Sequence, residues 1–259
     1  MRFRKRVLYW SCAVFLLGVG RVSHAVPQNG LVLHYTFEPP TITGDTVEDV
    51  SGTGADGTLS GAKAQSGVLV LDGADNYLST DPLGIRTGGA VPFTALAMFR
   101  TDKAENGPLW MWGDNAAPSA SGAAEGAVGW RSTTTNFAAG FYSGGHLYAN
   151  AEADYADGEW HSVAQVGEAL LGYLYLDGEQ ISSAVAGYEY GAPPYFLLGA
   201  RTKNSGSDLD DIEYFEGEID NVLLYDRALT GDEIVAIVEE VLAVSSRGKL
   251  ATLWGELRR

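Results

Sequence analysis

The side chains of this chain that could do chemistry are mostly carboxylates. The chain has 33 Asp+Glu against 17 Lys+Arg, with 4 His and 1 Cys. Glu38 follows the first segment of alternating apolar residues, Asp49 opens a glycine-rich loop, and Asp220 lies in the last such segment. Alternation along that segment predicts that Asp220 shares a face with Val222 and Leu224. Carboxylate and carbonyl oxygens are the ligands of calcium, which takes about six to eight of them. In the alternative hypothesis, Asp220 only accepts amide hydrogen bonds in a turn and Glu38 is solvated.

Short segments with alternating hydrophobicity separate these carboxylates and predict β-strands. Asp177-Gly178 predicts a tight hairpin turn between two of them. Many short strands and little helix indicate an all-β chain, folded as a two-sheet antiparallel β-sandwich (a jelly roll) with short C-terminal helices. The strands are expected at 31–37, 68–71, 77–78, 93–99, 109–112, 126–130, 137–142, 146–148, 160–166, 171–176, 180–181, 195–198 and 218–225.

One helix start is clear near the C-terminus. Thr230 and Glu233 have the spacing of a capping box, in which each side chain bonds the backbone N–H of the other residue. The apolar positions that follow have helical spacing and predict a buried stripe. These positions are Ile234, Ile237, Val238 and Val241.

The two ends of the chain differ from its middle. Residues 1–25 combine a basic start, an apolar stretch and small residues before a cleavage position, which predicts a signal peptide and a secreted or extracytoplasmic protein, periplasmic or at the cell surface. An uncleaved membrane anchor is the alternative. Residues 26–243 are expected to form one domain. Residues 244–259 form a short amphipathic, basic tail that either docks on the sandwich or binds a partner.

Charge and cysteine content exclude several classes of function. The formal net charge is −16 at pH 7, and loss of the basic leader would make it more negative. Such a surface repels phosphate backbones and anionic lipid headgroups, so we expect neither nucleic-acid binding nor membrane insertion after signal cleavage. The only cysteine, Cys12, lies in the leader, which leaves no disulfide and no thiol nucleophile.

Six segments of the chain carry a family resemblance: 30–38, 49–58, 71–78, 157–164, 174–178 and 215–234. In this order they resemble the laminin-G-like domains of the concanavalin-A-like lectin/glucanase family, as found in exported bacterial proteins. The resemblance implies a jelly roll that often binds calcium and that recognises ligands far more often than it catalyses. It also implies that the first and last strands are neighbours, so that Glu38, Asp49 and Asp220 converge on a calcium ion.

Catalysis of the laminarinase type is the sharpest enzyme hypothesis, because those glycoside hydrolases resemble this fold. They carry a Glu-x-Asp-x-x-Glu strand whose outer carboxylates act as nucleophile and acid/base. Here Glu218-Ile-Asp220 begins the pattern, but Leu223 and Leu224 stand where the second glutamate belongs. We therefore expect that the protein is not an enzyme. His161 is expected to be structural.

Aromatic side chains are the other candidate site, because sugar rings stack on flat apolar faces. Trp130, Tyr142 and His146 lie on or beside glycine-rich turns and are the predicted carbohydrate-binding residues. Trp110, Trp112 and Trp160 are expected to be core.

Two functions stay open: a carbohydrate-recognition module of a cell surface or matrix, and a structural or adhesive domain that binds a cell-surface protein. Exposed aromatics around a groove would favour the first, and a flat apolar patch the second.

Overall fold

The computed structural model describes residues 26–86, 91–103, 107–113, 124–131, 134–140, 146–148, 155–185, 195–202 and 212–241. In 124–131, 134–140 and 146–148, side-chain burial is described only for residues 127–129 and 137–139. The predicted signal peptide, 1–25, and the tail, 244–259, lie outside these residues.

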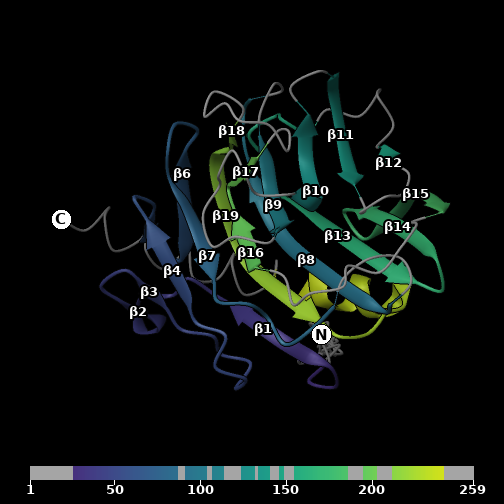
Figure 1. Cartoon of the computed structure of the whole chain (residues 1–259), viewed down its shortest axis with the longest axis horizontal. Helices are drawn as coiled ribbons and strands as arrows, with labels where there is room; N and C mark the ends of the chain where they lie inside the picture. Colours follow the sequence, from purple (N-terminus) through teal and green to yellow (C-terminus); the bar gives the residue numbers. More distant parts are fainter. Residues whose placement is uncertain are drawn as a thin grey trace, which may run out of the picture.

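Within them the chain forms a sandwich of two antiparallel sheets, which confirms the expected fold class (Figure 1). One sheet has eight strands. In order across it, the strands are β15 (Glu179–Val185), β14 (Leu171–Leu176), β13 (His161–Glu168), β8 (Phe93–Arg100), β19 (Glu216–Tyr225), β6 (Val68–Asp72) and β5 (Lys63–Gln65), and β1 (Leu31–Tyr35) also pairs with β19.

The other sheet has nine described strands. In order, they are β12 (His146–Tyr148), β11 (Thr134–Gly140), β10 (Ala124–Arg131), β9 (Pro108–Gly113), β16 (Tyr195–Leu198), β7 (Tyr77–Thr80), β4 (Gly57–Ser60), β3 (Thr46–Val47) and β2 (Ile42–Thr43). Beside the sheets lie a two-stranded ribbon of β17 (Ala200–Thr202) and β18 (Ile212–Tyr214), a 3-10 turn η1 (Pro39–Thr41), and a helix over residues 231–241.

The first and last strands are neighbours, as the sequence predicted. Leu33 of β1 lies opposite Leu224 of β19, and Tyr35 lies opposite Val222. All four side chains are buried in the core between the sheets. This pairing places β1, the first described strand, against the closing strand β19.

A polar bridge crosses the apolar core between the sheets. The indole N–H groups of Trp110 and Trp112, both on β9, donate to the side-chain oxygen of Gln165 on β13, each at 3.3 Å. All three side chains are at most 1% exposed, which confirms that these two tryptophans are core. A buried indole N–H needs an acceptor, and Gln165 supplies one from the facing sheet.

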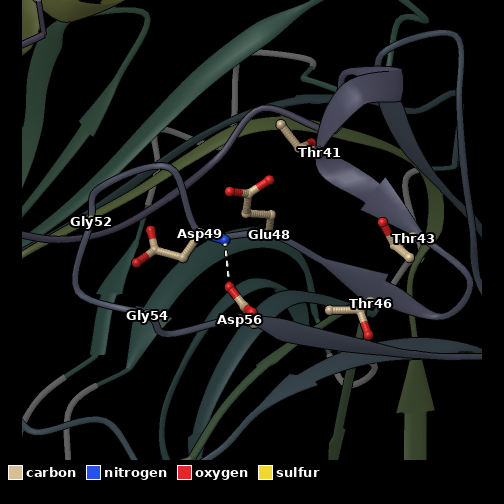
Figure 2. A pocket seen from close by; sticks show the side chains of 8 residues that line it. All are labelled: Thr41, Thr43, Thr46, Glu48, Asp49, Gly52, Gly54 and Asp56. Carbon is tan, nitrogen blue, oxygen red and sulfur yellow. Dashed lines mark hydrogen bonds between the residues drawn. The ribbon is translucent and has the colours of Figure 1, made fainter.

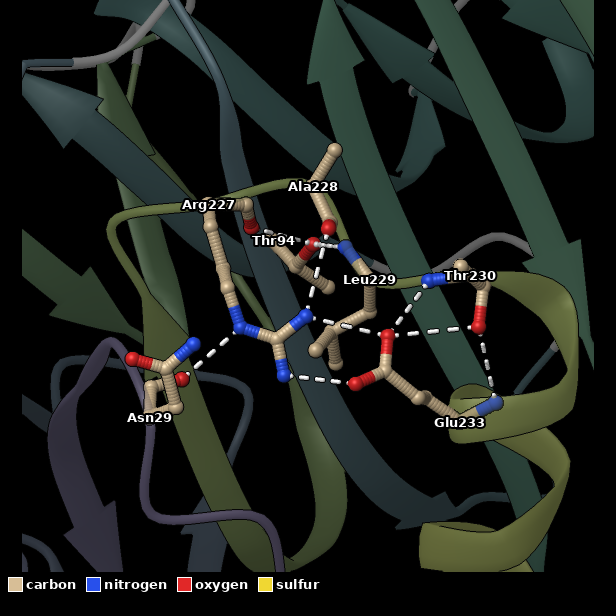
Figure 3. A network of polar contacts seen from close by, with 7 residues as sticks. All are labelled: Asn29, Thr94, Arg227, Ala228, Leu229, Thr230 and Glu233. Atoms are coloured by element: carbon tan, nitrogen blue, oxygen red, sulfur yellow. Dashed lines mark hydrogen bonds and ion pairs between the residues drawn. The ribbon is translucent and has the colours of Figure 1, made fainter.

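The helix over 231–241 covers the outer face of the eight-stranded sheet. Its predicted apolar stripe packs on buried residues of β8, β13 and β19, such as Leu96, Val166 and Leu223. The capping box is present: Thr230 N–H donates to Glu233 Oε2 at 2.9 Å, and Glu233 N–H donates to Thr230 Oγ1 at 3.3 Å (Figure 3). The Arg227 guanidinium, which donates to Glu233, contributes most to lowering the pKa of Glu233 to about 2.

Some described strands have no counterpart in the sequence prediction. These are β2, β3, β4, β5, β17 and β18, each of four residues or fewer. So short a strand carries too few residues for its alternation to stand out. Three of them, β2 to β4, form the end of the nine-stranded sheet that borders the candidate site. Among the described residues, no helix is both long and apolar enough to cross a membrane.

Candidate functional site

One carboxylate organises the glycine-rich loop from Asp49 to Asp56. One oxygen of Asp49 accepts the backbone N–H of His34 at 2.8 Å and that of Ser51 at 2.9 Å. Around its other oxygen lie the Ser51 hydroxyl at 2.7 Å, the Thr53 hydroxyl at 2.9 Å and the Ala55 N–H at 3.2 Å. Asp49 is only 5% exposed. Burial by itself would raise the pKa of this carboxyl, but these hydrogen bonds lower it below its usual value.

A further hydrogen bond links the two ends of the loop. Asp56 accepts the backbone N–H of Asp49 at 2.9 Å (Figure 2). Gly52 and Gly54 have φ of +89° and +81°, in the left-handed region that favours glycine. A Cβ at either position would meet nothing within 4 Å, so the backbone conformation, and not lack of space, calls for glycine.

A hollow of about 540 Å³ opens beside this loop. Threonines of η1, β2 and β3 line one side and the Asp49–Asp56 loop lines the other, with the Glu48 carboxylate between them (Figure 2). None of the lining residues is aromatic, so the hollow offers hydrogen-bonding groups without a stacking platform. The lining residues are Thr41, Thr43, Thr46, Glu48, Asp49, Gly52, Gly54 and Asp56.

The polar groups of the hollow fall into two sets. Asp49 and Asp56 are held by the loop, and the Thr41 hydroxyl donates to the Glu38 carbonyl at 2.9 Å. The side chains of Thr43, Thr46 and Glu48 have no hydrogen-bond partner in the described part of the chain, and all three are exposed. These three groups can therefore exchange hydrogen bonds with a ligand without breaking the frame around them.

The three predicted calcium ligands do not come together. The described residues contain no group of three or more His, Cys, Asp or Glu side chains that could hold a metal ion. Glu38 is exposed, and its carboxylate lies against Gly67, where a Cβ would be 2.9 Å from Oε1. The oxygens of Asp49 are already occupied by five donor groups. These residues do not fit a shared ion, and calcium binding by the protein stays a prediction.

The expected orientation of Asp220 was wrong for a local reason. Alternation along the strand would have put Asp220 on the face of Val222 and Leu224. Instead β19 has a bulge after Asp220, with Asn221 at φ +47°, and this bulge breaks the alternation. Asp220 is 3% exposed and accepts the N–H of Asn221 at 2.7 Å.

Two of the three predicted glycan-binding residues, Trp130 and His146, belong to the opposite end of the nine-stranded sheet. Trp130 lies in β10 opposite Phe137, and His146 begins β12 opposite Gly140. Their side chains, and the whole of Tyr142, lie outside the described residues, so their role in binding stays a prediction.

Glu218, the first residue of the incomplete glucanase pattern, is held in an ion pair with Arg100. Arg100 Nε donates to Glu218 Oε2 at 2.9 Å. The same guanidinium lies 5.1 Å from the ring centre of Trp160. The two positions where a second glutamate would fall, Leu223 and Leu224, are 0% exposed.

A second carboxylate cluster, which the sequence did not predict, surrounds His161. Its Nδ1 lies 2.8 Å from Asp177 Oδ2 and its Nε2 lies 3.2 Å from Asp157 Oδ1. Asp177 also accepts the N–H of Ser162 at 2.8 Å. The hydrogen bond to Asp177 contributes most to raising the pKa of His161, while burial opposes the rise. The available signal was an aspartate four residues before the histidine in Asp-Gly-Glu-Trp-His, together with the hairpin aspartate.

His34, on β1, has a pKa shifted in the direction opposite to that of His161. Burial lowers its pKa, against smaller opposing contributions from a hydrogen bond with Asn221 and from the charge of Asp49. Its Nε2 is buried without a hydrogen-bond partner among the described residues.

Solved structures with a similar fold include two carbohydrate-active proteins. Trypanosoma rangeli sialidase in complex with sialic acid matches 83% of this chain with a TM-score of 0.59 and 19% identity. The match covers 33% of that chain, so this chain spans about a third of the sialidase. Domain 4 of AbnA, an extracellular GH43 arabinanase from Geobacillus stearothermophilus, in complex with arabinotriose, matches 80% of this chain and 98% of its own length, with a TM-score of 0.56 and 18% identity.

No curated protein sequence matches the chain. A family model does: that of the concanavalin A-like lectin/glucanases superfamily matches residues 72–235. The match covers more than half of the chain and includes β7 to β19 and the start of the helix. Together with the two-sheet sandwich, it shows that the chain belongs to the concanavalin A-like lectin/glucanase superfamily.

Proposed function

We propose that this protein is an exported, non-catalytic carbohydrate-recognition module, and that the hollow beside the Asp49–Asp56 loop holds the glycan. The observation that carries the proposal is that two different sets of side chains line the hollow, one that holds the loop and one that faces solvent. Asp49 and Asp56 are used to hold the loop, and Thr43, Thr46 and Glu48 are left to face solvent. Sugar hydroxyls both donate and accept hydrogen bonds, and hydroxyl and carboxylate side chains at fixed positions match them.

The arabinanase domain supports a module of this size. It is one domain of a larger extracellular enzyme, its complex contains arabinotriose, and this chain matches nearly its whole length. A domain that contributes binding instead of hydrolysis needs no acid/base pair. The incomplete pattern in β19, where Glu218 is occupied by Arg100, agrees with that role.

The test is a glycan array probed with the purified full chain. We expect a discrete set of oligosaccharides to bind, and Thr43→Val with Thr46→Val to weaken that binding at least tenfold. Thr58→Val is the matched control, because Thr58 is an exposed threonine of the adjoining β4 outside the hollow. Loss of binding in Trp130→Ala, with the threonine variant unaffected, would move the site to the aromatic end of the sheet.

A second candidate function, binding of a cell-surface protein, is favoured by one apolar patch. Leu171 and Val185 are cross-strand partners on β14 and β15, and they are 38% and 67% exposed. Leu170, in the turn before them, is 53% exposed. Under this alternative, Leu170→Ser with Val185→Ser abolishes cell adhesion and leaves the glycan array unchanged.

A further inference from the structure

The hollow also limits the class of glycan that it can accept, an inference that rests on the proposed function. Three of its lining side chains are carboxylates, Glu48, Asp49 and Asp56, and none is basic. The pKa of Asp49 is lowered, so this group stays ionised well below neutral pH. A ligand in the hollow therefore meets negative charge from the loop and from Glu48.

Backbone donors hold both aspartates in the wall of the hollow. Asp49 is bound by backbone N–H groups of His34, Ser51 and Ala55, and Asp56 by that of Asp49. Both aspartates therefore place negative charge on the wall of the hollow, and Glu48, which has no such backbone donor among the described residues, can turn toward a bound sugar. Like charges brought close together in a partly desolvated site repel each other, which weakens binding.

We infer that the hollow binds an uncharged oligosaccharide and excludes glycans that carry carboxylate or sulfate groups. Glu48 accepts hydrogen bonds from sugar hydroxyls, and the hydroxyls of Thr43 and Thr46 donate to or accept from the same ligand. Glu48 then determines specificity as well as affinity. Of the ligands in the two similar structures, arabinotriose is uncharged and sialic acid carries a carboxylate, so the hollow suits the first chemistry and opposes the second.

The test uses pairs of oligosaccharides that differ only in oxidation at C6. Galactotriose with trigalacturonate, and glucose oligomers with their glucuronate counterparts, are immobilised beside arabinotriose and probed with the full chain in low and physiological salt. We expect binding to uncharged sugars, with every acidic partner at least tenfold weaker. The discrimination should be greater at low salt, because screening is weaker there.

Two charge-reversal variants locate the discrimination. Glu48→Lys should raise binding of the acidic sugars, relative to the uncharged ones, at least tenfold. Glu239→Lys makes the same charge change at an exposed glutamate of the helix over 231–241, on the outer face of the other sheet, and should leave that ratio unchanged.

Each outcome separates the inference from the function on which it rests. Equal or tighter binding of acidic sugars by the wild-type protein overturns the inference and leaves a carbohydrate-recognition module in place. An unchanged ratio in Glu48→Lys, with uncharged sugars still bound, overturns the assignment of specificity to Glu48 and the hollow. Binding of no oligosaccharide of either class overturns both.

Discussion

Two corners of the molecule are built around carboxylates and use them differently. At the Asp49 corner, one buried carboxylate accepts amide and hydroxyl donors, while Thr43, Thr46 and Glu48 remain available beside it. At the His161 corner, Asp157 and Asp177 bond both ring nitrogens of His161. At the Asp49 corner, the groups that hold the loop differ from the groups that can bind a ligand. At the His161 corner, the polar side chains bond one another. Only the first has the form of a binding site.

The two corners also differ in what titrates. The donors to Asp49 are amides and hydroxyls, which do not change protonation in the physiological range, so the hydrogen bonds around Asp49 keep their donors as the pH changes. The partner of Asp157 and Asp177 is an imidazole, whose charge changes near neutral pH.

The largest effect is expected for Asp49→Ala. The substitution leaves the N–H groups of His34, Ser51 and Ala55 without their acceptor and should lower the free energy of unfolding by about 3 kcal/mol. Urea denaturation at pH 7 measures it. Asp45→Ala, at an exposed aspartate of the β2–β3 turn, is the control and should change stability by less than about 0.5 kcal/mol. Similar losses in both variants would contradict the role given to Asp49.

A smaller, pH-dependent effect is expected for Asp177→Asn. Because the folded-state pKa of His161 is raised above its usual 6.5, the stabilisation from its charged form is complete below about pH 6.5 and is lost as pH rises through the folded pKa. The substitution should remove about 1 kcal/mol of this stabilisation at pH 6 and lower the pKa of His161. NMR titration of the imidazole measures the shift. A His161 pKa at or below 6.5 in the wild-type protein contradicts the account.

His34 should titrate with the opposite sign. Its folded-state pKa is lowered, so the unfolded chain takes up a proton first as pH falls below 6.5, and stability decreases toward acid. His34→Gln should therefore flatten the acid side of the stability profile, and His161→Gln should flatten the side above pH 6.5. Thermal melts of both variants from pH 5 to pH 8 test this, and profiles that change in the same direction would falsify the comparison.

The smallest effect on stability is expected at the available groups of the hollow. Thr43→Val, Thr46→Val and Glu48→Gln remove no hydrogen bond within the described part of the chain, so each should change the free energy of unfolding by less than about 0.5 kcal/mol. Their effect should appear in glycan binding alone. A loss of several kcal/mol in any of them would place that residue in the frame.

Sequence alone predicted the sandwich because its long strands alternate clearly and its helix start has a capping box. The apolar stripe of the helix over 231–241 was predicted correctly from its spacing, and the adjacency of β1 and β19 agrees with what the family resemblance implies. The orientation of Asp220 was predicted wrongly, because a bulge at one residue, Asn221, reverses the alternation of the strand. Such a bulge leaves no periodic signal in the sequence.

The candidate site was harder to predict than the fold. The sequence indicates Asp49 as a calcium ligand, but it does not show the donors around that carboxylate. They include the N–H of His34, fifteen positions earlier, which only the folded chain brings near. Thr43 and Thr46 lie on two-residue strands whose hydroxyls have no distinctive spacing. These two hydroxyls are candidates for ligand binding because they lie beside a loop whose own hydrogen bonds are already made.

The most direct test of the central claim is an NMR titration of the full chain with the tightest-binding uncharged oligosaccharide from the array. Backbone amide shifts report where the sugar binds, independently of any substitution. We predict that the largest shifts cluster between Thr41 and Asp56, around the hollow in Figure 2. Shifts confined to β10–β12, with residues 41–56 unchanged, would contradict the account and place recognition at Trp130 and His146.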